Sequence, residues 1–467
     1  MTQREAIVIA DLQYGMTGKG SLIDALTRWH EAHTVIRYNG GPQASAHVRT
    51  PEGHAHTFSQ FSSGTFAHAR THLSRYMLID PLAMRREETL LRKVGAPDIF
   101  FKTTIDYRAF VITPFHRAMN HLRELSRGSA RHGSSGTGMA EALSDAAVLG
   151  EDTLFAGDLK HRPTILAKLN RLRDYKIAQL DELKDHIPLV NIAEHELEIY
   201  YDPYMVEICT DAFADFGRLV RIVSEEFVER ILNRDGTVIF EGAQGLLLDQ
   251  WHGFYPYTSW SNTTMDNALE MLSEYNYEGR ITRLGVARAY MLRHGPGPFL
   301  TEDSELHNSI PVAHQENDWQ GPVRLGHFDL LATNYAIEAN GPLDFLALTG
   351  LDQLANLQQW YYAARYRYQG DQSTQGYFLQ TDNYVKAMIP NFAHDLQRQA
   401  HLTELLNHCI PDYEAFTPSD SDSMLVFAEM LAHNMRLPLA LISTGPTVNT
   451  KKTFNPWRQH FSNHHSV

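Results

Sequence analysis

Residues 6–21 read AIVIADLQYGMTGKGS, and this stretch decides the fold class. Its first part, residues 6–12, is a short apolar run typical of a buried strand. A glycine-rich loop follows at 15–20, and residues 22–31 then carry apolar side chains at helical spacing. A second short strand is predicted at 35–38. This strand–loop–helix–strand order predicts an α/β fold with a parallel sheet.

The loop at residues 15–21 is a candidate phosphate site. Glycines let the backbone approach phosphate oxygens, the start of a helix presents N–H groups to an anion, and Lys19 adds a cation. A Walker A motif has four residues between its first glycine and Gly-Lys, whereas this loop has two. We therefore interpret it as P-loop-like. A tight strand-to-helix turn with a surface lysine is the alternative.

The rest of the chain continues the α/β pattern. A hairpin is predicted over 47–58, helices at 114–126, 164–186 and 218–233, and strands at 237–241, 283–290, 344–349, 358–367 and 439–443. Polar loops at 128–138, 242–262, 293–303 and 317–327 stand next to strands. Because no repeat or linker separates them, we expect one large domain whose loops converge on one site.

Composition excludes several classes of protein. The 467 residues carry a formal net charge of -14, which disfavours nucleic acid as a partner. Only two cysteines are present, too few for a disulfide framework, so we expect a reducing, cytoplasmic location. No run of about 18 apolar residues occurs, so neither a membrane span nor a membrane partner is predicted.

Further motifs follow the phosphate loop in a set order. They are residues 37–44 (RYNGGPQA), 133–138 (GSSGTG), 240–249 (FEGAQGLLLD), 252–257 (HGFYPY), 261–264 (SNTT), 295–299 (GPGPF) and 443–446 (STGP). In this order and at these separations, the chain resembles the adenylosuccinate synthetase family from about residue 6 to residue 450. The resemblance implies one domain over residues 1–467 with an ordered core over about 6–450.

The resemblance also implies an activity. That family joins aspartate to IMP with GTP and Mg²⁺ through a 6-phosphoryl intermediate, in purine biosynthesis. Its fold is α/β with a central, mostly parallel sheet, and it works as a homodimer on small nucleotide and amino-acid substrates. Here Gly350 replaces a family lysine that packs on guanine, so GTP and ATP both stay open as the phosphoryl donor.

Roles carried over from the family are expectations for single residues. The catalytic residues would be His47, as general acid, with Lys19 and Gln244. The NTP would be bound by Gly15, Thr17, Gly18, Lys19, Gly20, Ser21, Arg324, Asp352, Ser443, Thr444 and Gly445. The purine nucleotide would contact Met16, Asn39, Gln43, Ser135, Gln244 and Ser259. The aspartate loop would include Gln320, Gly321 and Arg324, and the backbone of Ser45 would bind the metal.

The chain departs from the family at charged positions. Met16 replaces the aspartate that serves as general base and Mg²⁺ ligand, and a thioether can do neither job well. Losing a general base typically lowers a rate ~10²–10⁴-fold. Thr137 and Pro322 replace arginines. Residues 141–159 also contain no arginine, where the family donates one across its dimer. Arg131 and His132, which precede the loop at 133–138, are candidate substitutes for the missing arginines.

Three functions therefore stay open. The first is the ligase reaction on an IMP-like nucleotide. The second is the same chemistry on GMP or dGMP, because the non-acidic residue at 16 and residues 319–321 resemble the phage 2-aminoadenylosuccinate synthetase branch of the family. The third is a non-catalytic nucleotide-binding protein, a pseudoenzyme.

Two further groups of residues have structural and functional interpretations. His54, His56, His68 and His72 are spaced too loosely for a metal site to be favoured. The loop tryptophans, at positions 251, 260 and 319, are either base-stacking residues or loop anchors.

Overall fold

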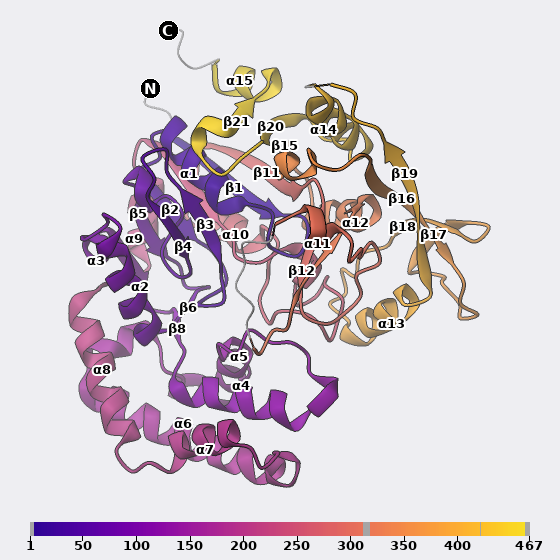
Figure 1. Ribbon diagram of the computed structural model, residues 1–467. Coiled ribbons are helices and arrows are strands. Elements are labelled where there is room, and N and C mark those ends of the chain that lie inside the picture. The colour runs from indigo at the N-terminus through magenta and orange to yellow at the C-terminus, as the bar shows by residue number, and fades with distance from the viewer. Residues whose placement is uncertain (1–3, 312–317, 421, 463–467) are drawn as a thin grey trace.

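The computed structural model describes residues 4–311, 318–420 and 422–462. A ten-stranded sheet runs through the molecule in the order β21-β20-β15-β11-β1-β10-β2-β5-β7-β9 (Figure 1). Every neighbouring pair is parallel except β20–β21. The strands are β1 (Arg4–Asp11), β2 (Thr34–Arg37), β5 (Arg70–Leu73), β7 (Thr103–Asp106), β9 (Arg221–Val223), β10 (Gly236–Glu241), β11 (Arg280–Arg288), β15 (Phe345–Thr349), β20 (Leu439–Ser443) and β21 (Lys451–Thr453). The predicted α/β fold with a mostly parallel central sheet is confirmed.

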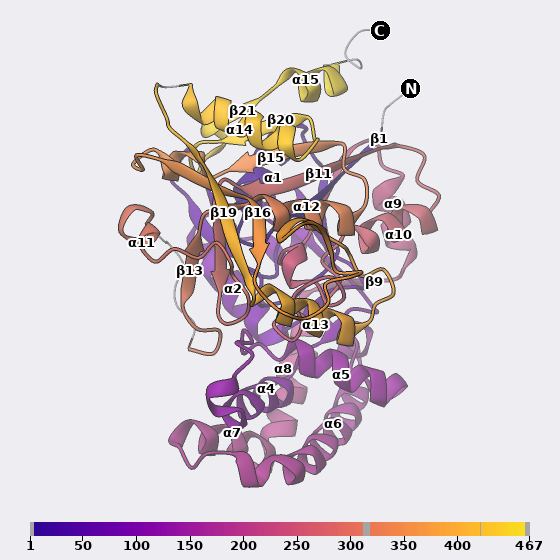
Figure 2. The ribbon, with the colours of Figure 1, turned by 90° about the vertical axis from the view of Figure 1, so that its right-hand side faces the viewer.

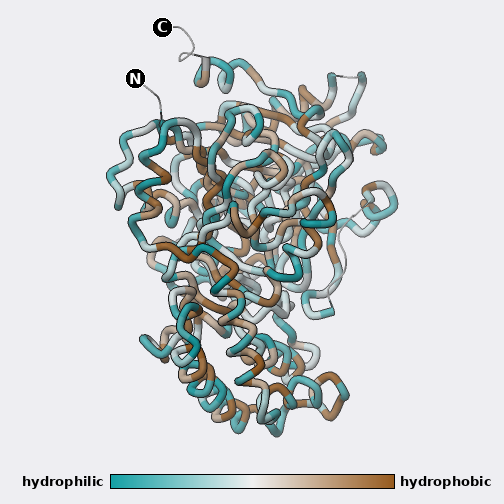
Figure 3. The backbone as a smooth tube through the Cα atoms, turned by 90° about the vertical axis from the view of Figure 1, so that its left-hand side faces the viewer, coloured by the Kyte–Doolittle hydropathy of each residue, from teal (hydrophilic) through white to brown (hydrophobic). Residues whose placement is uncertain are grey.

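Strand β1 lies in the middle of this sheet because it is apolar on both faces. Ile7 and Ile9 pack on one face against α1 (Lys19–Trp29). Ala6 and Val8 pack on the other face, against α9 (Glu226–Leu232) and α10 (Asp266–Glu274). A strand covered by helices on both sides reads as a continuous apolar run. Figure 3 shows such apolar stretches in the middle of the molecule.

A second, smaller sheet stands beside the carboxyl-terminal half of the first. It contains β14 (Phe328–Asp329), β16 (Trp360–Tyr368), β17 (Phe378–Thr381), β18 (Tyr384–Met388) and β19 (Cys409–Phe416). The helices on this side are α11 (Leu306–Ser309), α12 (Leu330–Asn340), α13 (Leu396–Leu406), α14 (Ser423–Asn434) and α15 (Asn455–Ser462). The hairpin strands are β3 (Ala46–Arg49) with β4 (Ala55–Phe58) and β12 (Met291–His294) with β13 (Val323–Gly326), and β6 (Leu78–Ile79) pairs β8 (Phe110–Val111).

A group of helices extends from the other side of the central sheet (Figures 1 and 2). They are α2 (Pro81–Lys93), α3 (Ile99–Lys102), α4 (Pro114–Ser126), α5 (Met139–Leu149), α6 (Arg162–Leu183), α7 (Asn191–Tyr201) and α8 (Met205–Leu219). Their apolar faces share one core with β5 and β7. No helix within the described residues is both long enough and apolar enough to cross a lipid bilayer.

Two predictions of secondary structure are wrong. The expected helix at 218–233 is instead the end of α8, the edge strand β9 and the helix α9. The run 221–223 contains two β-branched residues, and it completes the sheet by pairing with β7. The expected loop at 317–327 contains β13, which pairs with β12. Residue 317 of that range lies outside the described residues. The hairpin over 47–58 and the other predicted helices and strands are confirmed within a few residues.

Candidate active site

The carboxyl ends of six neighbouring strands bring most of the predicted residues to one edge of the sheet. In spatial order the strands are β20, β15, β11, β1, β10 and β2. Parallel α/β sheets bind ligands at this edge, in the loops that follow the strands. The ends of these six strands and the loops that follow them contain, in the same order, Ser443–Gly445, Asp352, Arg288, the phosphate loop, Gln244, and Asn39 with Gln43.

The phosphate loop has the geometry that its glycines require. Gly18 is the N-cap of α1 and adopts the left-handed conformation, with φ of 79°. Gly15 also has a positive φ, and a Cβ there would lie 2.8 Å from the Cα of Gln244. Gly20 faces the β3–β4 hairpin, because a Cβ would lie 2.9 Å from the backbone oxygen of His47. Gly15 and Gly20 therefore let the loop lie close against Gln244 and His47.

Lys19 does not stand free above this loop. Its Nζ donates to Asp11 Oδ2 at 2.5 Å, to the carbonyl of Gly15 at 3.0 Å and to the carbonyl of Gln244 at 2.8 Å. These contacts use all three ammonium hydrogens. Lys19 is 7% exposed and Asp11 is 2% exposed, so this is a buried ion pair. The charge of Lys19 is neutralised within the protein.

Asp11 organises the phosphate loop and was missed by the sequence analysis. Its Oδ1 accepts from the backbone N–H groups of Gln13 and Gly15, and its Oδ2 accepts from Thr17 Oγ1 at 2.5 Å as well as from Lys19. Its position, as a carboxylate at the end of an apolar strand and next to a glycine loop, could have identified it from the sequence. With both oxygens occupied, Asp11 fixes the shape of the loop.

A cavity of about 80 Å³ opens over the loop. Met16, Lys19, His47 and Gln244 line it, as predicted for a shared site, and Ser45 stands at its exposed rim. His47 Nδ1 lies 3.1 Å from Thr57 Oγ1 of the paired strand. Partial burial lowers the pKa of His47, and the nearby charge of Arg49 lowers it further. The imidazole is therefore mainly neutral at pH 7.

Gln244 and Ser259, two predicted nucleotide contacts, touch each other. Gln244 Nε2 donates to Ser259 Oγ at 2.6 Å, and its Oε1 accepts from Ser261 Oγ at 3.2 Å. Asn39 links the same loops, because its Nδ2 donates to the carbonyls of Ala243 and Asn262. Gln244 has a φ of 62°, rare for a residue with a side chain. Strain of this kind is often kept at functional sites.

Two arginines that the sequence analysis did not select also line this cavity. Arg37 ends β2, is 1% exposed, and donates from Nη1 to the carbonyls of Ser59 and Phe61. Arg288 ends β11 and donates from Nη1 to Tyr290 Oη at 2.7 Å. In both, Nε is buried without a partner. Across the described residues, neither forms an ion pair, so they are the unneutralised cations of the cavity. Their positions at the ends of predicted strands could have identified them from the sequence.

The loops after β15 and β20 form the far end of the site. Lys451 Nζ donates to the carbonyls of Gly445 at 2.7 Å and Thr447 at 3.1 Å, which fixes the loop containing Ser443 and Thr444. Burial lowers the pKa of Lys451 to about 8, against the opposing effect of Asp352. Gly350 precedes Asp352, and a Cβ there would lie 2.9 Å from Arg288 Cγ. Arg288 therefore spans from the phosphate loop toward these loops.

The remaining predicted residues gather elsewhere. A Cβ on Gly133 would lie 3.1 Å from the Gln320 carbonyl, and one on Gly295 would lie 2.2 Å from it, so three predicted loops do converge. None of Ser135, Gln320, Gly321 and Arg324 lines the cavity over the phosphate loop. Ser135 Oγ lies 2.9 Å from Thr137 Oγ1.

Arg324 is occupied within this second group of loops. Its guanidinium pairs with both carboxylate oxygens of Glu302, at 3.0 and 2.5 Å, and donates to the carbonyls of Gly295 and Gly297. The structure therefore does not bring Arg324 to the phosphate loop.

Trp319 anchors the loop expected to bind aspartate. Its ring stacks on His121, with centroids 3.9 Å apart and planes within 3°. His121 Nδ1 lies 2.6 Å from Glu196 Oε1, and its Nε2 lies 2.8 Å from the Gly136 carbonyl. Both ring nitrogens therefore have a hydrogen-bond partner. His121 thus joins the loop at 133–138 to the segment that contains Trp319.

The residues over the phosphate loop do not fit a protein-held Mg²⁺ site. Mg²⁺ takes oxygen ligands, usually one or two carboxylates besides substrate phosphates. Position 16 carries a thioether, Asp11 is occupied, and Glu241 accepts from the N–H and the hydroxyl of Ser63. Within the described part of the chain, no cluster of three or more His, Cys, Asp or Glu side chains could hold a metal.

The histidines between residues 54 and 72 contact separate partners. His56 Nε2 lies 3.6 Å from Glu87 Oε1, and His72 Nδ1 lies 2.9 Å from Thr104 Oγ1. Of the other loop tryptophans, Trp251 stacks on His394, while Trp260 is half exposed.

Comparison with known proteins gives one consistent family. A family model described as adenylosuccinate synthetase matches residues 8–449. The adenylosuccinate synthetase of Acidithiobacillus ferrooxidans is 30% identical over 468 residues, covering 94% of this chain and 96% of the relative. That of Thermus thermophilus is 33% identical over 368 residues, covering 77% and 82%.

Solved structures agree at the level of the fold. Fully ligated adenylosuccinate synthetase from Plasmodium falciparum superposes with a TM-score of 0.74 at 20% identity, covering 96% of this chain and 99% of that one. The succinoaminodeoxyadenylate synthetase of cyanophage S-2L, bound to dGMP and to dATP as an energy donor, superposes with a TM-score of 0.59 at 15% identity, covering 97% and 95%.

Proposed function

Since the chain belongs to the adenylosuccinate synthetase family, we propose that it is a ligase that joins aspartate to C6 of an IMP-like purine nucleotide. GTP or ATP would supply the phosphoryl group and leave as NDP and phosphate. One observation carries this proposal. Apart from Ser135 and Arg324, the residues expected to bind the NTP base, its phosphates and the purine nucleotide follow the spatial order of six adjacent strands. Two nucleotides placed along this edge would meet at the phosphate loop.

The reaction has two bond exchanges. The purine O6 attacks the γ-phosphorus, the bond from that phosphorus to NDP breaks, and a 6-phosphoryl purine results. The aspartate nitrogen then attacks C6, and phosphate leaves with the original O6. The loop amides, Arg37 and Arg288 would stabilise the negative charge of the transferring group. Protonated His47 would act as general acid, and Gln244 would orient the purine.

Lys19 and Gln43 have specific tasks in this scheme. Lys19 reaches a phosphate only by exchanging a carbonyl partner for a phosphate oxygen, because its three donors are already used. Both polar atoms of the Gln43 carboxamide are buried without a partner. Buried polar groups normally have partners, so a bound phosphate of the purine nucleotide would satisfy Gln43.

The charged groups around the phosphate loop determine how a metal and a base could be supplied. We propose that Mg²⁺ is held chiefly by the triphosphate that it accompanies, with the exposed backbone of Ser45 at the rim, since the carboxylates near the loop are occupied. Because residue 16 is a methionine, no carboxylate at this position can accept the proton of the purine N1–H. A rate ~10²–10⁴-fold below that of an enzyme with this base is the expectation.

Met16 also supports the second candidate, the same reaction on GMP or dGMP. Its side chain lines the cavity and packs against the apolar core. A flexible thioether imposes neither charge nor hydrogen bonds on a 2-amino group beside it. A substrate panel separates the two candidates.

A homodimer is also part of the proposal. Six large apolar side chains on and beside α7 and α8 are exposed, namely Leu189, Val190, Ile192, Tyr201, Tyr204 and Ile208. Large apolar side chains left exposed on neighbouring elements are often covered by a partner protein. We expect light scattering to give twice the chain mass, and Leu189→Ser with Ile208→Ser to shift the protein toward monomer.

The test of the proposed activity is a product search. The protein is mixed with Mg²⁺, aspartate, ATP or GTP, and IMP, GMP or dGMP in turn, and a succinyl adduct is sought by mass spectrometry. We expect an adduct with at least one nucleotide pair. Nucleotide binding without an adduct in any mixture would contradict the ligase and identify the pseudoenzyme.

A further inference from the structure

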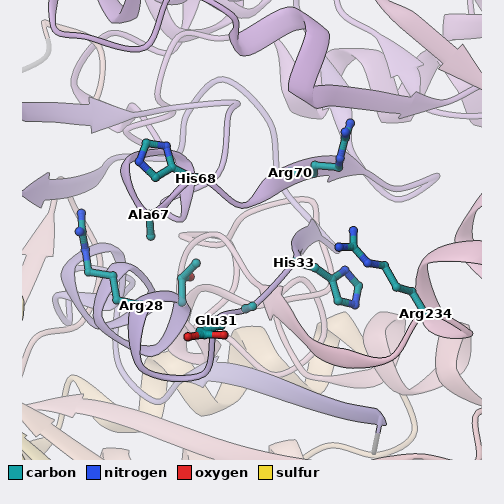
Figure 4. A pocket seen from close by; sticks show the side chains of 9 residues that line it. Arg28, Glu31, His33, Ala67, His68, Arg70 and Arg234 are labelled. Atoms are coloured by element: carbon teal, nitrogen blue, oxygen red, sulfur yellow. The ribbon is translucent and has the colours of Figure 1, made fainter. Parts of the chain in front are cut away.

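A second, larger cavity lies at the opposite edge of the central sheet (Figure 4). Its volume is about 360 Å³. Three segments that are distant in sequence line this open hollow: residues 27–33 at the end of α1, residues 67–70 at the start of β5, and Arg234 just before β10. These segments meet at the amino ends of β2, β5 and β10, away from the phosphate loop.

The charged lining of this cavity is mainly cationic. Arg28, Arg70 and Arg234 line it together with one carboxylate, Glu31, in a chain whose net charge is -14. Arg28 is held by Asp24, at 2.9 Å from Nε and 3.2 Å from Nη2. Among the described residues, no carboxylate lies within 4.0 Å of the guanidinium of Arg70 or of Arg234. Two guanidinium groups are therefore available to an anion.

The backbone around the cavity is held in uncommon conformations. Glu31 has a φ of 45° and His68 has a φ of 66°, and both line the cavity. Non-glycine residues rarely adopt positive φ, and such conformations concentrate at functional sites. Burial and the charge of Arg234 lower the pKa of His33 to about 4, so its ring is a neutral hydrogen-bonding group at pH 7.

We propose that this cavity is a binding site for a small phosphate-bearing anion. Planar guanidinium groups bind phosphate oxygens through paired N–H donors, and several arginines around one hollow are suited to more than one phosphate. The volume lies within the range of small-ligand sites. The ligand class is therefore pyrophosphate, free or as part of a nucleotide.

The cavity is joined to the catalytic one by three shared elements. Helix α1 contributes Lys19 to the catalytic cavity at its first residue and Arg28 to the second cavity in its last turn. Strand β2 follows His33 and ends at Arg37. Strand β10 follows Arg234 and ends at Glu241. An anion that shifts one of these elements would change the affinity of the other cavity for its ligand. A ligand in that other cavity would then change the affinity for the anion by the same factor.

Pyrophosphate titration with calorimetry tests the site. The wild-type protein is expected to bind at two places, the phosphate loop and this cavity. In the double variant Arg70→Gln/Arg234→Gln, the Kd of one of the two binding events should rise at least roughly tenfold, and the other event should be unchanged. A control of equal charge change is Arg162→Gln/Arg365→Gln, because both arginines are exposed and lie outside either cavity. It should keep both events.

Hydrogen exchange assigns each event to its place. Binding at the cavity should protect residues 27–34 and 67–71, and only in proteins that retain Arg70 and Arg234. An unchanged isotherm in the double variant, or pyrophosphate protection confined to residues 15–21, would overturn the site. ADP should compete with pyrophosphate, whereas competition by adenosine, which lacks phosphate, would also overturn it. If the wild-type protein bound pyrophosphate at this cavity but not at the phosphate loop, that result would contradict the proposed function and still support the second site.

Discussion

The two cavities at opposite ends of the same strands differ in how they present positive charge. At the carboxyl edge, the space is about 80 Å³, and its cations are a neutralised Lys19, a buried Arg37 and a half-buried Arg288. At the amino edge, the space is about 360 Å³, and Arg70 and Arg234 are exposed. Arginines held in a buried, rigid site stabilise developing charge well, whereas exposed ones bind through mobile, screened contacts. Chemistry is therefore expected at the first cavity and reversible binding at the second.

The largest effect that this contrast predicts belongs to His47. Replacing it with Gln removes the general acid and should lower kcat ~10²–10⁴-fold. His54→Gln is the matched control, because His54 follows β3 in the same hairpin but lines neither cavity. Steady-state rates with the best substrate pair measure both variants. Equal rates for the two would remove His47 from the mechanism.

Asp11→Asn should have the next largest effect, on stability. It leaves the buried ammonium of Lys19 without its carboxylate, and breaking a buried pair in this way typically costs about 3 kcal/mol or more. Urea unfolding gives the change in the free energy of unfolding. The double variant Asp11→Asn/Lys19→Met should lose less free energy of unfolding than the sum of the losses in the two single variants. Strict additivity would show that the pair is not coupled.

Arg288→Gln should produce a smaller loss, confined to the NTP. The loss of one charge-assisted contact at a half-exposed position should raise KM for the NTP about tenfold, with little change for aspartate. Arg283→Gln is the control, because Arg283 lies on the same strand and pairs with Asp344 outside the cavity. If the two variants behave alike, Arg288 does not contact the NTP.

The smallest predicted effect is a shift in pH dependence. Burial lowers the pKa of His47 from the ordinary value of 6.5, so the protonated form is lost at lower pH than in an exposed histidine. If His47 is the general acid, kcat/KM should fall as the pH rises through a midpoint below 6.5, and this limb should vanish in His47→Gln. A midpoint at or above 6.5 would place the titration on another group.

The fold was largely predictable because apolar periodicity marks strands and helices directly. Residues 114–126 and 439–443 coincide with α4 and β20. The failure at 218–233 has a nonlocal cause, since β9 forms only by pairing with β7, about 115 residues earlier in the chain. Local patterns carry no information about such a partner.

The site was predictable in its backbone parts and less so in its charges. The glycine loop, Gln244 and His47 line one cavity as expected. The neutralisation of Lys19 depends on Asp11 turning back under the loop. The engagement of Arg324 depends on Glu302, 22 positions away in the sequence. Pairing between side chains is a property of the folded molecule, so residue type alone could not reveal which cations stay available.

The fate of the purine O6 tests the central proposal most directly. The protein is given its best purine nucleotide labelled with ¹⁸O at position 6, together with aspartate, Mg²⁺ and the NTP. If O6 takes up the γ-phosphoryl group before aspartate attacks C6, the label must leave with phosphate. We expect one ¹⁸O in each phosphate released and none in the succinyl product. Phosphate released without label would contradict the 6-phosphoryl route and, with it, the proposed ligase mechanism.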